Sequence, residues 1–155
     1  GHAAAAGLTI QEKNVAAFRS DFCDQVAEML KTECQMAELF IDAEAPFIQL
    51  TTQNVEQIQQ LAPFGKDNPR PIFVASEVEI VPKSAKRMGG GQRHLTVTLA
   101  QFNKKIRCVA FGQGDWAEEL DQVSGLIDVA FKPVINEFRG QRNVELHIED
   151  WRLSQ

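Results

Sequence analysis

Residues 94–110, HLTVTLAQFNKKIRCVA, alternate between apolar and polar side chains in two short runs. Apolar residues centred on Val97 alternate with two threonines, and apolar residues centred on Cys108 alternate with basic side chains. A period of two is typical of a β-strand that buries one face. The stretch therefore predicts two neighbouring strands, with Phe102 near the turn between them.

The same period continues on both sides of this stretch. It predicts one strand before it, around Val74 and Val78, and two strands after it, around Val129 and Leu146. A short acidic segment, DWAEELDQ at 115–122, predicts a helix between the third and fourth strands. Five short strands in this order are typical of an OB-fold barrel, and closure of a barrel removes exposed sheet edges.

The first part of the chain has a helical period instead. Apolar residues from Val15 to Leu30 recur at steps of three and four, which predicts a helix over 11–37 with its apolar stripe packed in a core. A second helix is predicted from Thr51 or Thr52 to about Leu61. The stretch LAPFGKDNPRP at 61–71 cannot continue a helix or a central strand, so it predicts a domain boundary.

We therefore expect an α+β chain. Its predicted parts are a partial α/β portion over 1–62, with short β-like pieces between Glu38 and Leu50, a linker over 63–71 and a five-stranded OB-fold β-barrel over 72–155.

Charge is unevenly distributed along this acidic chain, whose formal net charge is -5. No acidic residue occurs from Ile80 to Gly114, whereas seven basic residues do: Lys83, Lys86, Arg87, Arg93, Lys104, Lys105 and Arg107. Such segregation favours a surface for an anionic polymer, with a solvated basic face as the alternative.

The basic residues fall where OB-folds bind their ligands. The loop PKSAKRMGGGQR at 82–93 joins the first two strands, and its glycines are expected to make it mobile. Binding of a single strand requires cations for the phosphates and aromatic rings for the bases. For Phe102 the alternative is a turn residue that folds back onto the core. The residues we expect to bind substrate in this region are Lys83, Lys86, Arg87, Arg93, Thr96, Thr98, Phe102, Lys105 and Arg107.

The chain shows no complete catalytic apparatus. Its histidines, His2, His94 and His147, are scattered, and its cysteines have no metal-ligand spacing. No apolar run reaches the roughly 18 residues of a membrane span, and no signal peptide is evident. We expect no metal site, no membrane association and a reducing, cytoplasmic location.

The order of motifs resembles the C-terminal part of the RecJ family within the DHH phosphoesterase superfamily. GHAAAAGLTI at 1–10 is followed by a helix with Phe18 and Phe22, then by LAPFGKDNPRPIF at 61–73 and the OB-like region. Asp67 departs from the glycine that the family usually has there. On its own, the leading Gly-His pair is better explained as the remnant of a cleaved tag, and the longer context favours the family motif. The positions that match the family's glycine-glycine-histidine motif are Gly1, His2, Ala3, Ala5, Ala6 and Gly7.

The resemblance implies that residues 1–62 are the end of a DHH-associated domain and that the intact protein hydrolyses single-stranded DNA from its 5′ end. Family members use two manganese or magnesium ions, bound by a DHH domain that this sequence does not include. By the same resemblance, Gly1 and His2 contact the substrate, with His2 as a catalytic contact to a phosphate. Single-stranded DNA is the implied partner, single-strand-binding protein is a second candidate, and the roles implied are DNA repair and recombination.

Two alternatives remain at this point. One is a non-enzymatic OB module that binds single strands or a protein. The other is a different relative with a DHH-associated domain, such as an oligonucleotide phosphodiesterase or the tail of alanyl-tRNA synthetase. The expected OB domain after the junction argues against the second alternative. The chain by itself is expected to be inactive as a nuclease.

Overall fold

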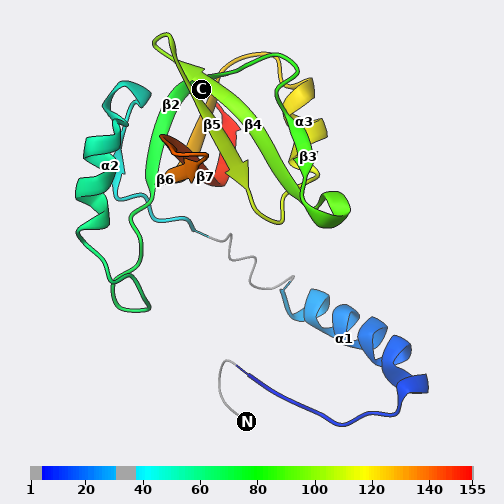
Figure 1. Ribbon diagram of the computed structural model, residues 1–155. Coiled ribbons are helices and arrows are strands. Elements are labelled where there is room, and N and C mark those ends of the chain that lie inside the picture. Colours follow the sequence, from blue (N-terminus) through cyan, green and yellow to red (C-terminus); the bar gives the residue numbers. More distant parts are fainter. Residues whose placement is uncertain (1–4, 31–37, 155) are drawn as a thin grey trace. The chain divides into compact units, whose positions relative to one another are not determined.

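A computed structural model describes residues 5–30 and 38–154 of the chain (Figure 1). The chain divides into two compact units, Gly1–Leu39 and Phe40–Gln155, which are described separately. No helix in the described ranges is long and apolar enough to cross a membrane.

The first unit contains a short 3-10 helix, η1 (Glu12–Asn14), that leads directly into helix α1 (Val15–Leu30). The rings of Phe18 and Phe22, one helical turn apart, stack with their centroids at 5.7 Å. The prediction that the apolar stripe is core is not met, because no residue of α1 is buried. The described residues of this unit supply no second layer for the stripe to pack against. Residues 31–37 of the predicted helix lie outside the described residues.

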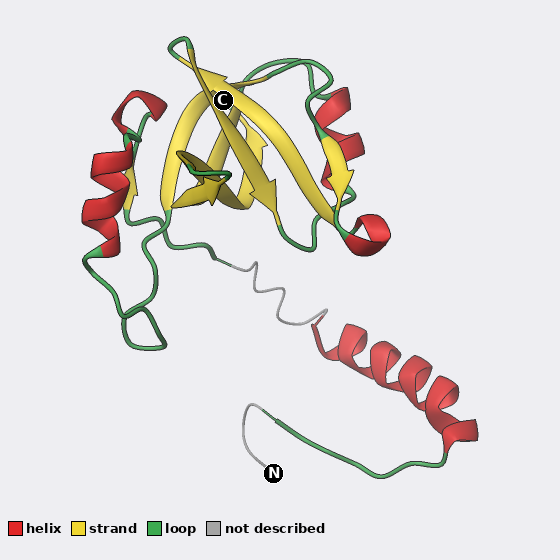
Figure 2. Ribbon diagram, viewed as in Figure 1, coloured by secondary structure: helices red, strands yellow, loops and turns green. Residues whose placement is uncertain are grey.

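The second unit is a β-structure with short helices (Figure 2). The predicted helix near Thr51 is confirmed, and the Thr51 hydroxyl accepts a hydrogen bond from the Asn54 N–H at 3.1 Å as its cap. The acidic helix before the fourth predicted strand is also confirmed. The elements are β1 (Ala43–Glu44), η2 (Phe47–Gln49), α2 (Thr52–Gln59), β2 (Phe73–Ile80), β3 (Lys86–Met88), η3 (Gly90–Gln92), β4 (His94–Gln101), β5 (Lys104–Ala110), α3 (Trp116–Gln122), β6 (Ile127–Phe138) and β7 (Gln141–Leu153).

Strand pairing in the second unit closes on itself. The sheet runs in the order β1-β2-β6-β7-β5-β4-β3, and β4 also pairs with β2 through Glu79–Ala100 and Ile80–Leu99. The strands β2, β4, β5, β7 and β6 thus form a closed circuit, in which only the β5–β7 pair is parallel. This confirms the predicted OB-fold in an α+β chain. The short strands β1 and β3 were not predicted.

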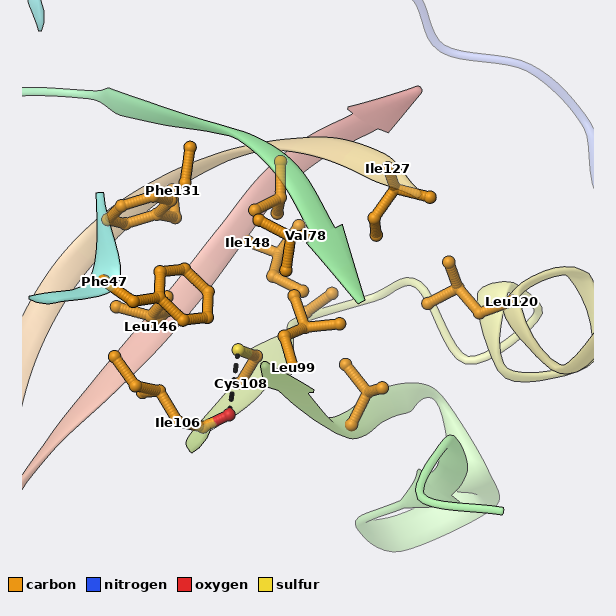
Figure 3. Packing of buried hydrophobic residues seen from close by; sticks show 14 of the residues in the cluster. Phe47, Val78, Leu99, Ile106, Cys108, Leu120, Ile127, Phe131, Leu146 and Ile148 are labelled. Atoms are coloured by element: carbon orange, nitrogen blue, oxygen red, sulfur yellow. Dashed lines mark hydrogen bonds between the residues drawn. The ribbon is translucent and has the colours of Figure 1, made fainter. Parts of the chain in front are cut away.

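The core lies inside this circuit (Figure 3). Phe131 of β6 is fully buried, and Phe47 of η2 packs edge-on against it with ring centroids 6.4 Å apart. The Phe47 N–H donates to the Gln101 side-chain oxygen at 2.7 Å, which fixes η2 to the end of β4. Phe47 therefore belongs to the core of the barrel, although it precedes the predicted linker.

The boundary between the compact units does not coincide with the predicted linker. Asp42 exchanges two hydrogen bonds with the Ile72 backbone, each at 2.8 Å, and β1 then pairs in parallel with β2. The segment over 63–71 forms a turn, in which the Asn68 side-chain amide donates to the carbonyls of Leu61 and Pro63. This turn joins α2 to β2 within one unit, so residues 40–62 pack with the barrel. Their assignment to a DHH-associated domain stays a prediction.

Candidate nucleic-acid interface

The outer face of β3, β4 and β5 brings several predicted binding residues together. Lys86 lies opposite Thr96, and Thr98 lies opposite Arg107. Directly opposed residues of neighbouring strands point to the same side of a sheet, so these side chains share one face. Lys105 lies two residues before Arg107 and joins the same face.

A groove of about 920 Å³ continues this face between β5 and the β6–β7 hairpin. Its lining includes basic side chains on β5 and an aromatic ring on the β6–β7 hairpin. Phe138 is 65% exposed and lies beneath the Arg139 guanidinium, 5.1 Å from the ring centroid. The lining residues that bear charge or an aromatic ring are Lys104, Lys105, Arg107, Phe138, Arg142 and Glu145.

Glu145 is a buried carboxylate in the middle of this basic face. It forms an ion pair with Arg107, and the Asn136 amide donates to the same carboxylate oxygen at 3.1 Å. The other oxygen lies 3.5 Å from His147 Nε2. Because its carboxylate is held from three sides, Glu145 fixes the Arg107 guanidinium, which stays half-exposed. Arg107 is therefore presented to solvent in one orientation, with part of its charge already compensated.

Lys104 is less available than its position suggests. Its ammonium donates to the Leu50 carbonyl at 2.9 Å, and burial lowers its pKa. Lys105, by contrast, is exposed and forms no salt bridge with any residue in the described ranges.

Arg87, another predicted binding residue, is engaged elsewhere. Its guanidinium lies 2.8 Å from Asp115 and 3.0 Å from Glu118, both beside or on α3. The hydrogen bond with Glu118, together with the charges of both acids, raises the pKa of Arg87. Its charge is therefore compensated by the protein before any phosphate arrives. Lys83 is exposed in the turn between β2 and β3, and Arg93 is exposed directly before β4.

Two glycines between β3 and β4 are required by the backbone conformation. Gly89 and Gly91 have φ of +81° and +70°, a region that side chains rarely adopt. Gly114, in the segment before α3, donates to the Arg93 carbonyl at 3.0 Å. A Cβ at Gly114 would lie 2.3 Å from the Gln92 carbonyl oxygen, so the two segments meet at backbone distance. The residues directly before β4 are thus held against the segment that leads into α3.

Phe102 lies at the tip of the β4–β5 turn, apart from the basic face. The ring is 71% exposed, so it does not fold back onto the core. It borders a hollow of about 540 Å³ whose charged lining consists of Glu44, Glu77 and Glu79. Because three carboxylates repel phosphate, these surroundings argue against the predicted contact of Phe102 with a nucleic acid.

Gly1 and His2 lie outside the described residues, so their predicted contacts have no structural counterpart here. Within the described ranges, no three His, Cys, Asp or Glu side chains are grouped closely enough to hold a metal ion. These residues do not fit a two-metal site. Phe138 and Arg142, which line the groove, were not predicted as site residues. The Arg139-Gly140 turn between them follows an alternating strand and is a recognisable hairpin signal.

The chain is similar to known proteins over most of its length. Residues 41–150, more than half of the chain, match the family model described as the RecJ OB domain. The single-stranded-DNA-specific exonuclease RecJ of Dickeya dadantii is 31% identical over 99% of this chain and 26% of its own length. The exonuclease of the same name from Bacillus subtilis is 24% identical over 100% of this chain and 19% of its own length. The chain thus spans about a fifth to a quarter of these relatives.

The solved structures agree on the fold. A crystal structure of RecJ in complex with Mn2+ from Thermus thermophilus matches 96% of this chain and 20% of its own, with a TM-score of 0.55 at 23% identity. A Mg2+ complex from the same organism matches with a TM-score of 0.54. Together with the family match over 41–150, this likeness covers the barrel, and the chain belongs to the family of RecJ OB domains.

Proposed function

We propose that this chain is the C-terminal portion of a 5′→3′ single-stranded-DNA exonuclease, and that its OB domain holds the unpaired strand on the face of β4 and β5. The observation that carries the proposal is the groove beside Lys105 and Arg107, which continues a basic sheet face and ends at an exposed aromatic ring. Cations that follow a phosphate backbone and rings that stack on bases are the two requirements for binding single strands.

In this proposal the hydrolysis itself belongs to a metal-dependent DHH domain outside this sequence. The names of the relatives support such an activity for the intact protein, and the Mn2+ and Mg2+ complexes of the solved RecJ structures support a divalent metal. Gly1 and His2 would contact the substrate strand between the domains, with His2 placed at a phosphate. DNA repair and recombination are the proposed roles, and single-strand-binding protein is a second proposed partner.

The binding half of the proposal is tested by fluorescence anisotropy. A labelled single-stranded oligonucleotide and the matching duplex are titrated with the 155-residue chain. We expect saturable binding that prefers the single strand and weakens as salt is raised. Equal and weak binding of both forms would overturn it, because the basic face would then be an ordinary solvated surface.

The division of labour has a separate test. We expect the chain alone to leave a single strand intact in the presence of manganese, and hydrolysis to appear when the DHH portion of the same protein is supplied. Hydrolysis by the purified chain alone, at a rate proportional to its concentration, would contradict this assignment.

A further inference from the structure

An exposed aromatic ring lies on the same outer face, at the opposite end of β5 from the groove. Phe111 directly follows β5 and is 58% exposed. It is flanked by His94 of β4 and His147 of β7, with ring centroids at 5.5 and 5.0 Å. The planes of both histidine rings are nearly perpendicular to the phenyl ring, at interplanar angles of 71° and 88°. These three residues are called the Phe111 cluster below.

The cluster is held in place by its surroundings. The Gly112 N–H donates to His94 Nδ1 at 2.8 Å, which fixes the orientation of that ring. Gly89 lies so close to His94 that a Cβ there would be 2.7 Å from the ring. On the other side, His147 is fixed in the ladder opposite Val109. Phe111 is therefore supported by two fixed rings, and little freedom has to be lost when a planar ligand stacks on it.

Basic side chains border the cluster. Arg70, Lys132 and Arg107 all lie close enough to His147 to act on its pKa, which is lowered chiefly by burial. Two carboxylates oppose them: Glu149 is paired with Lys132 at 3.0 Å, and Glu145, the partner of Arg107, lies 3.5 Å from His147. The cations therefore outnumber the acids by one at the cluster. An exposed ring among cations combines a stacking surface with attraction for phosphate. The contrast is Phe102, a phenylalanine that is more exposed still, at 71%, and borders a hollow lined by three carboxylates and no basic side chain.

We propose that the Phe111 cluster is a stacking site for one unpaired nucleobase of the bound strand. This inference rests on the proposed function and adds to it a binding residue that lies away from the groove. The base would stack on the exposed part of the Phe111 ring, which the two histidines hold in place. The neighbouring cations would face the phosphates on either side of that base.

The test compares two exposed phenylalanines and two kinds of strand. Phe111→Ala, Phe111→Trp and the matched control Phe102→Ala are titrated by anisotropy with a short oligonucleotide and with its abasic counterpart, which keeps the phosphates and lacks the bases. Loss of one base–aromatic stack corresponds to about 5- to 150-fold weaker binding. We expect a loss in this range for F111A on the normal strand and almost none on the abasic strand. F102A should bind like the unchanged chain, and F111W should retain affinity.

The outcomes separate the inference from the proposed function. If the unchanged chain binds the strand while F111A matches F102A, the stacking site is wrong, the ring is left for a protein contact, and the proposed function stands. An equal loss of affinity by F111A on normal and abasic strands also overturns stacking, because it shows a general effect on the face. If the unchanged chain binds neither strand, both proposals fail. Since Phe111 is exposed, the melting temperature of F111A should stay close to that of F102A, and a large drop would assign the ring to folding.

Discussion

Replacing one unpaired and one salt-bridged cation tests which basic residues contribute to the proposed binding of single-stranded DNA. Lys105 is exposed, lines the groove and has no acidic partner among the described residues, whereas Arg87 is paired with Asp115 and Glu118. Both occur in the same acid-free stretch of sequence, so a count of charges treats them alike. The structure predicts that Lys105→Ala weakens binding of single-stranded DNA with a smaller salt dependence, and that Arg87→Ala leaves the salt dependence unchanged.

The magnitude follows from the cations that line the groove. Each phosphate neutralised on a single strand contributes about 0.7 to the slope of log affinity against log salt. Contacts from all four basic residues of the groove would give a slope of about −2.8, so a fourfold rise in salt would weaken binding about 50-fold. Removal of one contact leaves about −2.1, or about 20-fold. This is an upper limit, because two of the four are already paired with acids. The four are Lys104, Lys105, Arg107 and Arg142.

The assay is fluorescence anisotropy of a labelled oligonucleotide at salt concentrations from about 50 to 200 mM, the range in which such slopes are read. The unchanged chain, K105A and R87A are compared at each concentration. An unchanged slope in K105A would show that the strand does not run along the groove. A decrease in R87A as large as that in K105A would show that the ion pairs with α3 give way to phosphate, and the reasoning from compensated charge would be refuted.

Three further substitutions test the fold that carries this face. Gly114→Ala would place a Cβ 2.3 Å from the Gln92 carbonyl oxygen, so we expect a loss of about 1–3 kcal/mol in urea unfolding, whereas the same change at the open position Gly7 should cost far less. Phe131→Ala empties a fully buried site in the barrel and should lower the free energy of unfolding by about 3–5 kcal/mol without a change in the denaturant m-value. The pKa of Asp128 is lowered, chiefly by the Ser154 hydroxyl at 2.7 Å, so its stabilisation is present above the unfolded pKa of about 3.9 and is lost as pH falls through the lower folded pKa. Asp128→Asn should flatten the decline of stability in that acid range, and a parallel decline in both proteins would contradict the assignment.

The strands that the sequence predicts best are those with one uninterrupted buried face. In β4 and β5 the alternation around Val97 and Cys108 matches burial in the structure. Strand β2 is different, because its register shifts between Ala75 and Val78 and Glu77 takes a positive φ of 55°. An extra residue in one strand changes which side chains face inward, and the alternation of apolar and polar residues does not predict where such a residue occurs.

The boundary between the two units lies before the predicted linker for a different reason. Phe47 and the two residues of β1 join the barrel through contacts with segments more than 25 positions away. A Pro- and Gly-rich stretch marks a turn reliably, and whether that turn separates domains depends on what packs across it. Here Asn68 closes the turn on itself, and both flanking segments return to the same sheet.

The candidate site, too, could be predicted only where neighbouring residues of one strand determine it, and not where strands distant in sequence meet. The sequence places Lys105 and Arg107 on one strand face because alternation is local. It gives no hint that Glu145 completes that face, since the parallel pairing of β5 with β7 joins residues that are far apart in the chain. Phe102 and Phe111 look alike in sequence, and only the neighbours supplied by other strands distinguish an acidic hollow from a basic face.

The acids that pair with these cations from other parts of the chain also limit how strongly the basic face attracts phosphate. Two of the seven cations between Lys83 and Arg107 have salt bridges to acids outside that stretch, Arg87 to residues at α3 and Arg107 to Glu145 on β7. The field at the surface is therefore weaker than the local sequence charge implies. Under the proposed function, an OB domain past which a strand advances would gain from this arrangement, because a fixed guanidinium and the proposed stacking ring would orient the strand without holding every phosphate tightly. On this argument Glu145→Gln has two opposing effects, a gain in attraction and a loss of orientation at Arg107, and a net loss of affinity would show that orientation is the larger of the two.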